Sequence, residues 1–143
     1  MSVASSISKA YCAFNELMEK LTPVALLAGR LYIARIFLKS GIKKAKDMNG
    51  AEMLFKYEYE LPLIPADIAA YLATAAEIIF PIMLILGMAA RFGAIGIFIM
   101  VLVIELLVFP GTTEHYYQMI ILGIIMTHGA GKLSVDHLLL KRK

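Results

Sequence analysis

Residues 66–89 read ADIAAYLATAAEIIFPIMLILGMA, and this stretch decides the fold. A helix needs about 20 apolar residues to cross a hydrocarbon core of about 30 Å, and this run is long enough. Its only acidic or basic residues are Asp67, near the start, and Glu77, near the centre. The stretch is therefore predicted to be a transmembrane helix that carries a carboxyl group in the middle of the membrane.

Three further apolar runs of similar length flank this one, at residues 24–42, 92–109 and 114–131. Gly87 and Arg91 mark a tight turn between the second and third runs, and Pro110 closes the third. Connections this short force neighbouring helices to run antiparallel. The sequence thus predicts an all-α integral membrane protein, in which residues 23–143 form a four-helix up-down-up-down bundle.

The first residues have a different pattern. Apolar side chains recur at helical spacing in residues 1–22, at Val3, Ile7, Tyr11, Phe14, Met18 and Leu21. Charged residues occupy the other faces, which is typical of an amphipathic helix lying in the membrane interface. We expect this N-terminal helix to end before Pro23.

The composition agrees with a membrane protein. Of 143 residues, 60% are hydrophobic and 17% are charged, whereas soluble domains have about 45–50% apolar and about 25% charged residues. A water-soluble globule and a disordered chain are both excluded, and the lipid bilayer is the expected partner. The net charge of +3 comes from scattered residues, so no nucleic-acid partner is expected. One cysteine, Cys12, excludes an intramolecular disulfide.

Basic residues predict the orientation. One side of the membrane would receive Lys9, Lys20, Arg91, Lys132, Lys141, Arg142 and Lys143, and the other side Lys43, Lys44, Lys46 and Lys56. The positive-inside rule places the richer side, with both termini, in the cytoplasm. We therefore expect a multi-pass protein of a bacterial inner membrane whose loop 43–65 faces the periplasm.

Five charges lie within the predicted spans, at Arg30, Arg35, Lys39, Glu77 and Glu105. An unpaired charge at mid-bilayer costs about 2.5–3.5 kcal/mol, so these side chains should pair inside the bundle. With a rise of about 1.5 Å per residue, Arg35 matches the level of Glu77. By the same counting, Lys39 matches the level of Glu105. These two pairs are the predicted intramembrane contacts.

Two interpretations of these charges have equal weight. They are structural ion pairs that fix helix register, or they line a ligand-binding or proton-handling cavity. Pro81 removes the usual hydrogen-bond donor to the carbonyl of Glu77, and nearby alanines keep that face narrow. The second interpretation therefore predicts a small polar chamber at Glu77.

Aromatic residues are expected at the outer mouth of this chamber. Phe55, Tyr57 and Tyr59 alternate with charged residues, which suits a short extended segment whose aromatics pack on the bundle, with a lid as the alternative. His115 and Tyr117 lie at the outer interface, where an aromatic belt is expected and a metal or quinone-headgroup contact is the alternative. His115 and His128 are about 20 Å apart along one helix and cannot share a haem. No metal site and no intrinsic cofactor are predicted.

The chain resembles the DoxX family of small bacterial membrane proteins over residues 24–140. The matching residues are Arg35, Gly41, Lys43-Lys44, Glu77, Leu86-Gly87, Arg91 and Gly129-Ala130-Gly131-Lys132-Leu133-Ser134-Val135-Asp136. The resemblance implies a four-helix membrane bundle close to redox chemistry, as in the membrane subunit of thiosulfate:quinone oxidoreductase. Carried over by position, its candidate residues are Arg35, Lys44, Glu77, Arg91 and Asp136.

Two functions follow as hypotheses. The first is a membrane subunit that supports a redox partner protein and holds a quinone or similar small ligand; its candidate ligand-binding or proton-handling residues are Arg35, Lys39, Glu77, Glu105, Lys44 and Arg91. Any enzymatic role would be that of a quinone-linked oxidoreductase subunit, not of a complete enzyme. The alternative is a non-catalytic scaffold or assembly factor whose charges only fix helix packing. Transport is less favoured, because no inverted repeat is visible, and a homo-oligomer is left open.

Overall fold

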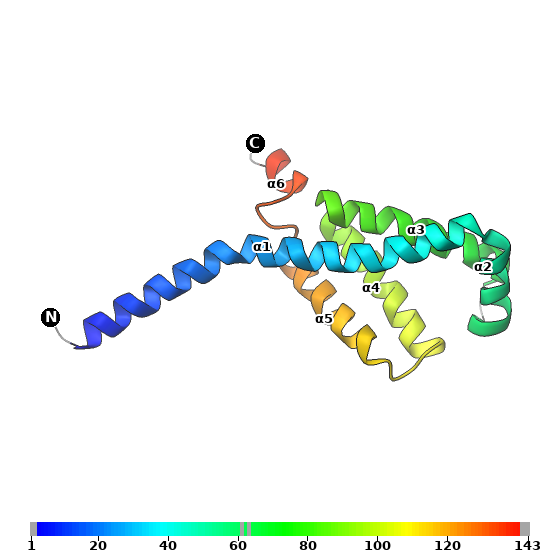
Figure 1. Cartoon of the computed structure of the whole chain (residues 1–143), viewed down its shortest axis with the longest axis horizontal. Coiled ribbons are helices and arrows are strands. Elements are labelled where there is room, and N and C mark those ends of the chain that lie inside the picture. The colour runs from blue at the N-terminus through cyan, green and yellow to red at the C-terminus, as the bar shows by residue number, and fades with distance from the viewer. Residues whose placement is uncertain (1–2, 61, 63, 141–143) are drawn as a thin grey trace.

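The computed structural model describes residues 3–60, 62 and 64–140, and within them every regular element is a helix (Figure 1). The elements are α1 (Val3–Lys46), α2 (Met48–Leu54), the π-helix η1 (Phe55–Tyr59), α3 (Ala66–Leu86), α4 (Ala90–Leu107), α5 (Thr113–His128) and α6 (Val135–Leu140). The predicted all-α class is confirmed. Lys141, Arg142 and Lys143, which contribute to the predicted orientation, lie outside the described residues.

The first helix is longer than predicted. Helix α1 runs through Pro23 without ending and contains 44 residues. Proline removes one backbone hydrogen bond, here to the carbonyl of Glu19, a residue that lies on the exposed part of α1, where solvent or lipid headgroups can replace the lost donor. The N-terminal half of α1 extends past the other helices (Figure 1), and its described side chains up to Thr22 are exposed. That residues 1–22 lie in the membrane interface stays a prediction.

Helices α1, α3, α4 and α5 pack around one apolar core. Successive members of this set contact one another, and α5 also contacts α1. The core includes Ile33, Phe37, Leu84, Ile97, Leu122 and Ile125. On α4 the buried residues recur every three or four positions, as at Gly93, Ile97 and Val101, so a single stripe of that helix faces inward. Chain direction alternates along the series (Figure 1).

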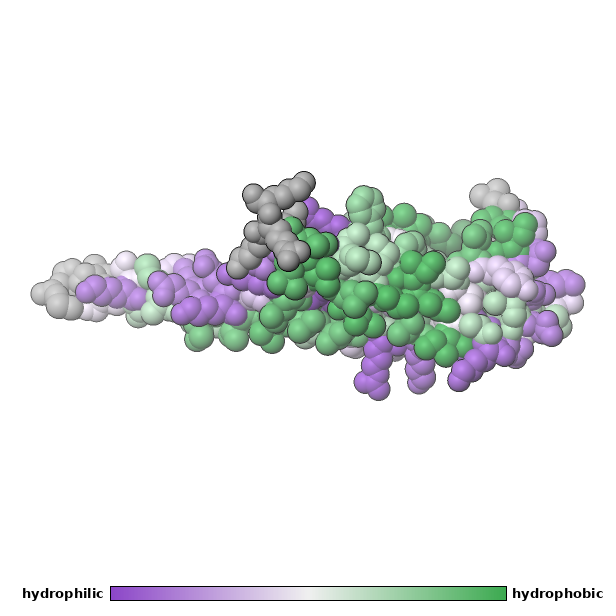
Figure 2. Space-filling model, turned by 90° about the horizontal axis from the view of Figure 1, so that it is seen from above, coloured by the Kyte–Doolittle hydropathy of each residue, from purple (hydrophilic) through white to green (hydrophobic). Residues whose placement is uncertain are grey.

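The outside of this helical body is apolar enough for a membrane. Three described helices are long and hydrophobic enough to cross one: Ser6–Lys46, Ala66–Leu86 and Ala90–Leu107. Helix α5 has 16 residues, shorter than the predicted run 114–131 and than the typical length of about 20. Figure 2 shows hydrophobic residues over most of the body and hydrophilic ones towards its ends and along one edge. The protein is therefore a membrane protein, and a bundle with four crossings stays a prediction.

The segment after α5 ties the helices together at one end. The Asp136 carboxylate accepts hydrogen bonds from the backbone N–H groups of Ala89 (2.8 Å) and Ala90 (3.3 Å), at the start of α4. The N–H of Asp136 donates to the carbonyl of Gly87 (3.0 Å). Gly87 ends α3 with a φ of 66°, a conformation that favours glycine. Asp136 is thus an N-cap supplied from a distant part of the chain.

Candidate functional site

A buried ion pair joins the end of α1 to the centre of α3. The Nζ atom of Lys44 lies 2.6 Å from Oε1 of Glu77, and the two side chains are only 10% and 6% exposed. The ammonium group also donates to the hydroxyl of Ser40, 3.2 Å away. A pair this short and this buried is a charge-assisted hydrogen bond in a low-dielectric environment.

The predicted partner of Glu77 was Arg35, and that prediction is wrong. Gly41 packs directly on α3, since a Cβ atom at this position would lie 2.9 Å from the Cβ of Glu77. The true partner, Lys44, comes nine residues after Arg35, which corresponds to about 13 Å along the helix. The prediction placed the first span at residues 24–42. Because α1 is continuous, close contact at Gly41 sets its axial position instead.

Arg35 and Lys39 lie outside the core. Both side chains are exposed, in a shallow apolar groove with Leu31, Leu38, Ile42 and Ile85. Neither has an ion-pair partner among the described residues. Arg35 and Lys39 are therefore not part of the site at Glu77.

Arg30 is the buried cation of α1 instead. Its guanidinium group donates to the carbonyls of Leu84 and Leu133. A Cβ atom at Gly87 would collide with its Nη1 atom and with the Cβ atom of Ser134, and the positive φ of Gly87 favours glycine as well. Backbone carbonyls, not a carboxylate, accept the two hydrogen bonds of this group, and its Nε atom is buried without a partner among the described residues.

The second predicted pair, between Lys39 and Glu105, is also wrong. Glu105 contacts the start of the next helix: its Oε2 atom lies 2.7 Å from Nδ1 of His115, and its Oε1 atom accepts the N–H of Gly111 at 2.6 Å. An ionised carboxylate only accepts hydrogen bonds, so Nδ1 of His115 carries the proton. The connection between α4 and α5 is short, so His115 lies within reach of Glu105. His115 therefore ties two helices together and is absent from the mouth of the cavity.

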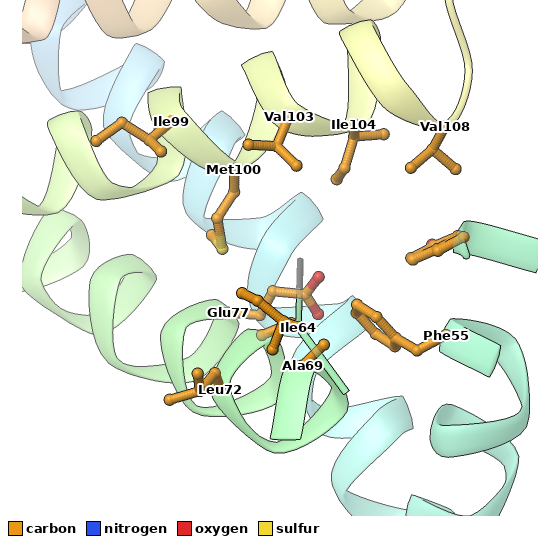
Figure 3. A pocket seen from close by; sticks show the side chains of 12 residues that line it. Phe55, Ile64, Ala69, Leu72, Glu77, Ile99, Met100, Val103, Ile104 and Val108 are labelled. Atoms are coloured by element: carbon orange, nitrogen blue, oxygen red, sulfur yellow. The ribbon is translucent and has the colours of Figure 1, made fainter. Parts of the chain in front are cut away.

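An apolar cavity lies beside Glu77, between η1, α3 and α4 (Figure 3). Its volume is about 160 Å³. Its walls are Phe55, Tyr59, Ile64, Ala69, Leu72, Ala73, Glu77, Ile99, Met100, Val103, Ile104 and Val108. Glu77 is the one charged member of this wall, and Figure 3 shows its carboxylate between Met100 of α4 and Phe55 of η1.

One oxygen of Glu77 has no partner. Oε1 accepts from Lys44, but Oε2 is buried without a hydrogen bond among the described residues. A buried acceptor without a donor costs about 1–3 kcal/mol, and more when it is charged. The predicted small chamber at Glu77 is thus present, but its walls are apolar and its unsatisfied group is a hydrogen-bond acceptor.

The aromatic segment that closes the cavity is helical, so the predicted extended segment is wrong. In η1, Phe55 and Tyr59 are four residues apart and share one face, with ring centroids 4.8 Å apart and planes at 70°. Both line the cavity, whereas Tyr57 is 62% exposed and points elsewhere. Burial, followed by the negative charges of Glu77 and Glu58, raises the pKa of Tyr59, so its phenol stays protonated at neutral pH.

Phe55, Tyr57 and Tyr59 were expected together at the mouth, with Tyr57 and Tyr59 as the named candidates. The period of four between Phe55 and Tyr59 is the signal that separates the two residues of the cavity wall from Tyr57. Tyr117, the other predicted mouth residue, is exposed on α5 and is absent from the cavity wall. Phe55 and Tyr59 thus pack at the cavity, and a lid stays a prediction.

The remaining candidates, Arg91 and Asp136, make contacts between helices away from Glu77. Arg91 donates to the carbonyl of Thr127 at 3.3 Å, which links α4 to the end of α5. Asp136 caps α4, as described above. Both act at the end of the body formed by the α3–α4 turn, whereas the cavity lies towards the opposite end of α3.

The chain is similar to a known protein family. The DoxX family model matches residues 25–110, which are more than half of the chain. The chain belongs to the DoxX family. A Haemophilus influenzae relative described as an uncharacterized protein is 34% identical over 128 residues, covering 82% of this chain and 85% of that protein. No solved structure matches this DoxX-family chain. The matched range includes Lys44, Glu77 and the whole cavity wall.

Proposed function

We propose that this DoxX-family protein binds a lipid-soluble ring compound that carries a hydroxyl group, such as a quinol or another phenol, in the cavity beside Glu77. The observation that carries the proposal is the buried Oε2 atom of Glu77, an acceptor without a donor at the edge of an apolar cavity. A hydroxyl group of the ligand would supply the missing hydrogen bond. The apolar walls would hold the ring.

The chemistry of the pair favours the reduced ligand. An ionised carboxylate accepts hydrogen bonds only, so it recognises the hydroxyl of a quinol and not the carbonyl of a quinone. Lys44 lies outside the cavity wall and donates to Glu77 and Ser40, so Glu77 is the charged group that the ligand meets. Glu77 is also placed to accept a proton released when a bound quinol is oxidised by a partner.

The size of the cavity limits the ligand to one ring. A volume of about 160 Å³ is close to that of an engineered cavity of about 150 Å³ that binds benzene in another protein. Leu72 and Ile99 belong to the wall and are more than half exposed, so the cavity opens towards lipid. An isoprenoid or acyl tail would leave through this opening into the bilayer.

The proposed setting is that of a quinone-linked subunit beside a redox partner protein. The single cysteine of the chain excludes a dithiol carrier of its own, so electrons would pass through the ligand and the partner. In this proposal the chain crosses a bacterial inner membrane four times, and both of its termini lie in the cytoplasm. The family resemblance and the basic residues of the flanks support this arrangement.

A cavity-filling variant tests the ligand site without touching the ion pair. Ala73→Leu adds a side chain inside the cavity, whereas Ala75→Leu adds the same atoms on the exposed side of α3. Binding of 1,4-hydroquinone and of its dimethyl ether, which lacks donors, is measured by calorimetry on detergent-purified protein. We expect at least tenfold tighter binding of hydroquinone by the wild type and by Ala75→Leu, and loss of that binding in Ala73→Leu. Equal binding of the two compounds would refute the proposed ligand chemistry.

A scaffold is the second candidate function. It is favoured by the fact that the Lys44–Glu77 and His115–Glu105 pairs each join two helices. In this case Ala73→Leu keeps full activity in cells, and the double variant Lys44→Leu, Glu77→Leu folds and remains active. Loss of activity in the folded double variant would reject a purely structural role.

A further inference from the structure

A polar hollow lies at the end of the body where the α3–α4 turn meets α6 (Figure 1). Its walls come from the start of α4, the end of α5, the connecting segment 129–134 and the start of α6. Its volume is about 590 Å³, within the range of about 300–1,000 Å³ that is usual for small-molecule sites. We call it the basic hollow, because Arg91 and Lys132 line it together with a single acid, Asp136. Its wall shares no residue with the cavity at Glu77, so its role is separate from the proposed function.

The charges of the basic hollow do not balance. Both carboxylate oxygens of Asp136 already accept backbone N–H groups at the start of α4. Neither Arg91 nor Lys132 forms an ion pair among the described residues. The hollow therefore has a positive potential that attracts an anion from outside the chain.

The guanidinium group of Arg91 is held in place while most of its donors stay available. It donates to the carbonyl of Thr127 at 3.3 Å. It also packs over Gly129, where a Cβ atom would lie 3.3 Å from Nε. A guanidinium group has five N–H donors in a planar fork that matches the oxygens of a phosphate group. Because the contact with Thr127 uses one of them, the others can bind an oxyanion.

The connecting segment adds a backbone donor to the same hollow. Ala130 lines the hollow and is only 5% exposed. Its N–H group donates to no carbonyl among the described residues, although buried backbone N–H groups are almost always paired. An oxygen atom of a bound anion would supply the acceptor that this group lacks.

The basic hollow lies at the level of the membrane surface. Helix α4 is one of the helices that can cross a membrane. It has 18 residues and is about 27 Å long, close to the hydrocarbon thickness of about 30 Å. Arg91 is in its first turn and so lies at the edge of the hydrocarbon, beside the lipid phosphates. Phe92 also lines the hollow and is 72% exposed, so an acyl chain can pack against it.

We propose that the basic hollow binds the headgroup of an anionic phospholipid such as phosphatidylglycerol. Arg91 and Lys132 hold the phosphate oxygens, and Phe92 contacts an acyl chain. A phospholipid combines the anion and the hydrocarbon that this wall accommodates, whereas a soluble phosphate compound leaves Phe92 uncovered. Basic pockets between transmembrane helices are a recognised form of anionic headgroup site.

The test uses the full-length protein purified in a nonionic detergent. Phosphatidylglycerol and phosphatidylcholine with the same acyl chains are added in equal amounts, and native mass spectrometry counts the lipids that stay bound. Arg91→Gln with Lys132→Gln removes both cations of the hollow. Lys9→Gln with Lys20→Gln is the matched control, because it removes the same charge from the exposed N-terminal half of α1. Lys132→Gln alone guards against misfolding, since Lys132 is exposed and has no described ion-pair partner.

We expect the wild type and the Lys9/Lys20 variant to retain one phosphatidylglycerol at least about tenfold more often than one phosphatidylcholine, because each cation near a headgroup contributes about a fivefold preference. Lys132→Gln should lower this preference about fivefold. The Arg91/Lys132 variant should lose it.

Four results would overturn the proposal. Equal retention of the two lipids by the wild type would show that the hollow does not select an anionic headgroup. A preference that survives in the Arg91/Lys132 variant would place the lipid elsewhere, and an equal loss in the Lys9/Lys20 variant would assign the preference to overall charge. Inorganic phosphate in large excess tests the source of the anion: bound phosphatidylglycerol should resist it, and displacement would assign the hollow to a soluble phosphate compound.

Discussion

Removing Lys44 should destabilise the protein far more than removing Arg35, although both are cations of α1. Lys44→Met leaves the carboxylate of Glu77 buried with both oxygens unpaired, since Oε2 already has no partner. Breaking a buried pair by removing one member costs about 3–5 kcal/mol. Lys44→Met with Glu77→Leu removes both charges, and we expect that double variant to recover most of the loss, to within about 2 kcal/mol of the wild type.

Thermal unfolding in detergent, followed by circular dichroism, measures these differences. A chain of this size shifts by about 2–4 °C per kcal/mol, so Lys44→Met should melt roughly 10 °C below the wild type. Arg35→Leu is the matched control: its side chain is exposed and has no described partner, so its melting temperature should change little. The reasoning is refuted if Arg35→Leu is as unstable as Lys44→Met. It also fails if the double variant is no more stable than the single one.

Three further substitutions test the packing around the site by the same melting assay. Gly41→Ala places a methyl group 2.9–3.0 Å from atoms of Glu77 and should lower the free energy of unfolding by about 1–3 kcal/mol. Gly123→Ala meets nothing within 4 Å and should raise the free energy of unfolding by up to about 1 kcal/mol through helix propensity. Equal effects of the two substitutions would contradict the close contact at Gly41. Asp136→Ala should lower the free energy of unfolding by about 0.5–2 kcal/mol, because it removes the cap of α4. An unchanged melting temperature would show that this cap does not stabilise the protein. His115→Leu should cost about 1–3 kcal/mol by leaving an oxygen of Glu105 unpaired, and a variant as stable as the wild type would show that the pair is dispensable.

The sequence predicted the class of the protein and the extent of its central helices. The predicted runs 66–89 and 92–109 correspond to α3, Ala66–Leu86, and α4, Ala90–Leu107. Hydropathy and turn residues are properties of one segment at a time, so they can be recognised before any tertiary contact is known. The importance of Glu77 was predicted on the same basis, because a lone carboxyl group in an apolar run requires a partner.

The identity of that partner was decided by the tertiary structure. Lys44 reaches Glu77 because Gly41 allows α1 to approach α3 at that point, and this contact sets an axial offset between the helices. The sequence pattern also did not reveal that the side chain of Arg35 is exposed on the outside of the helical body. In a soluble protein the apolar stripe of a helix marks its inner face, but a membrane helix is apolar towards lipid and towards the core alike. Periodicity alone therefore identifies neither the inner face nor the register of two such helices, and only their packing does.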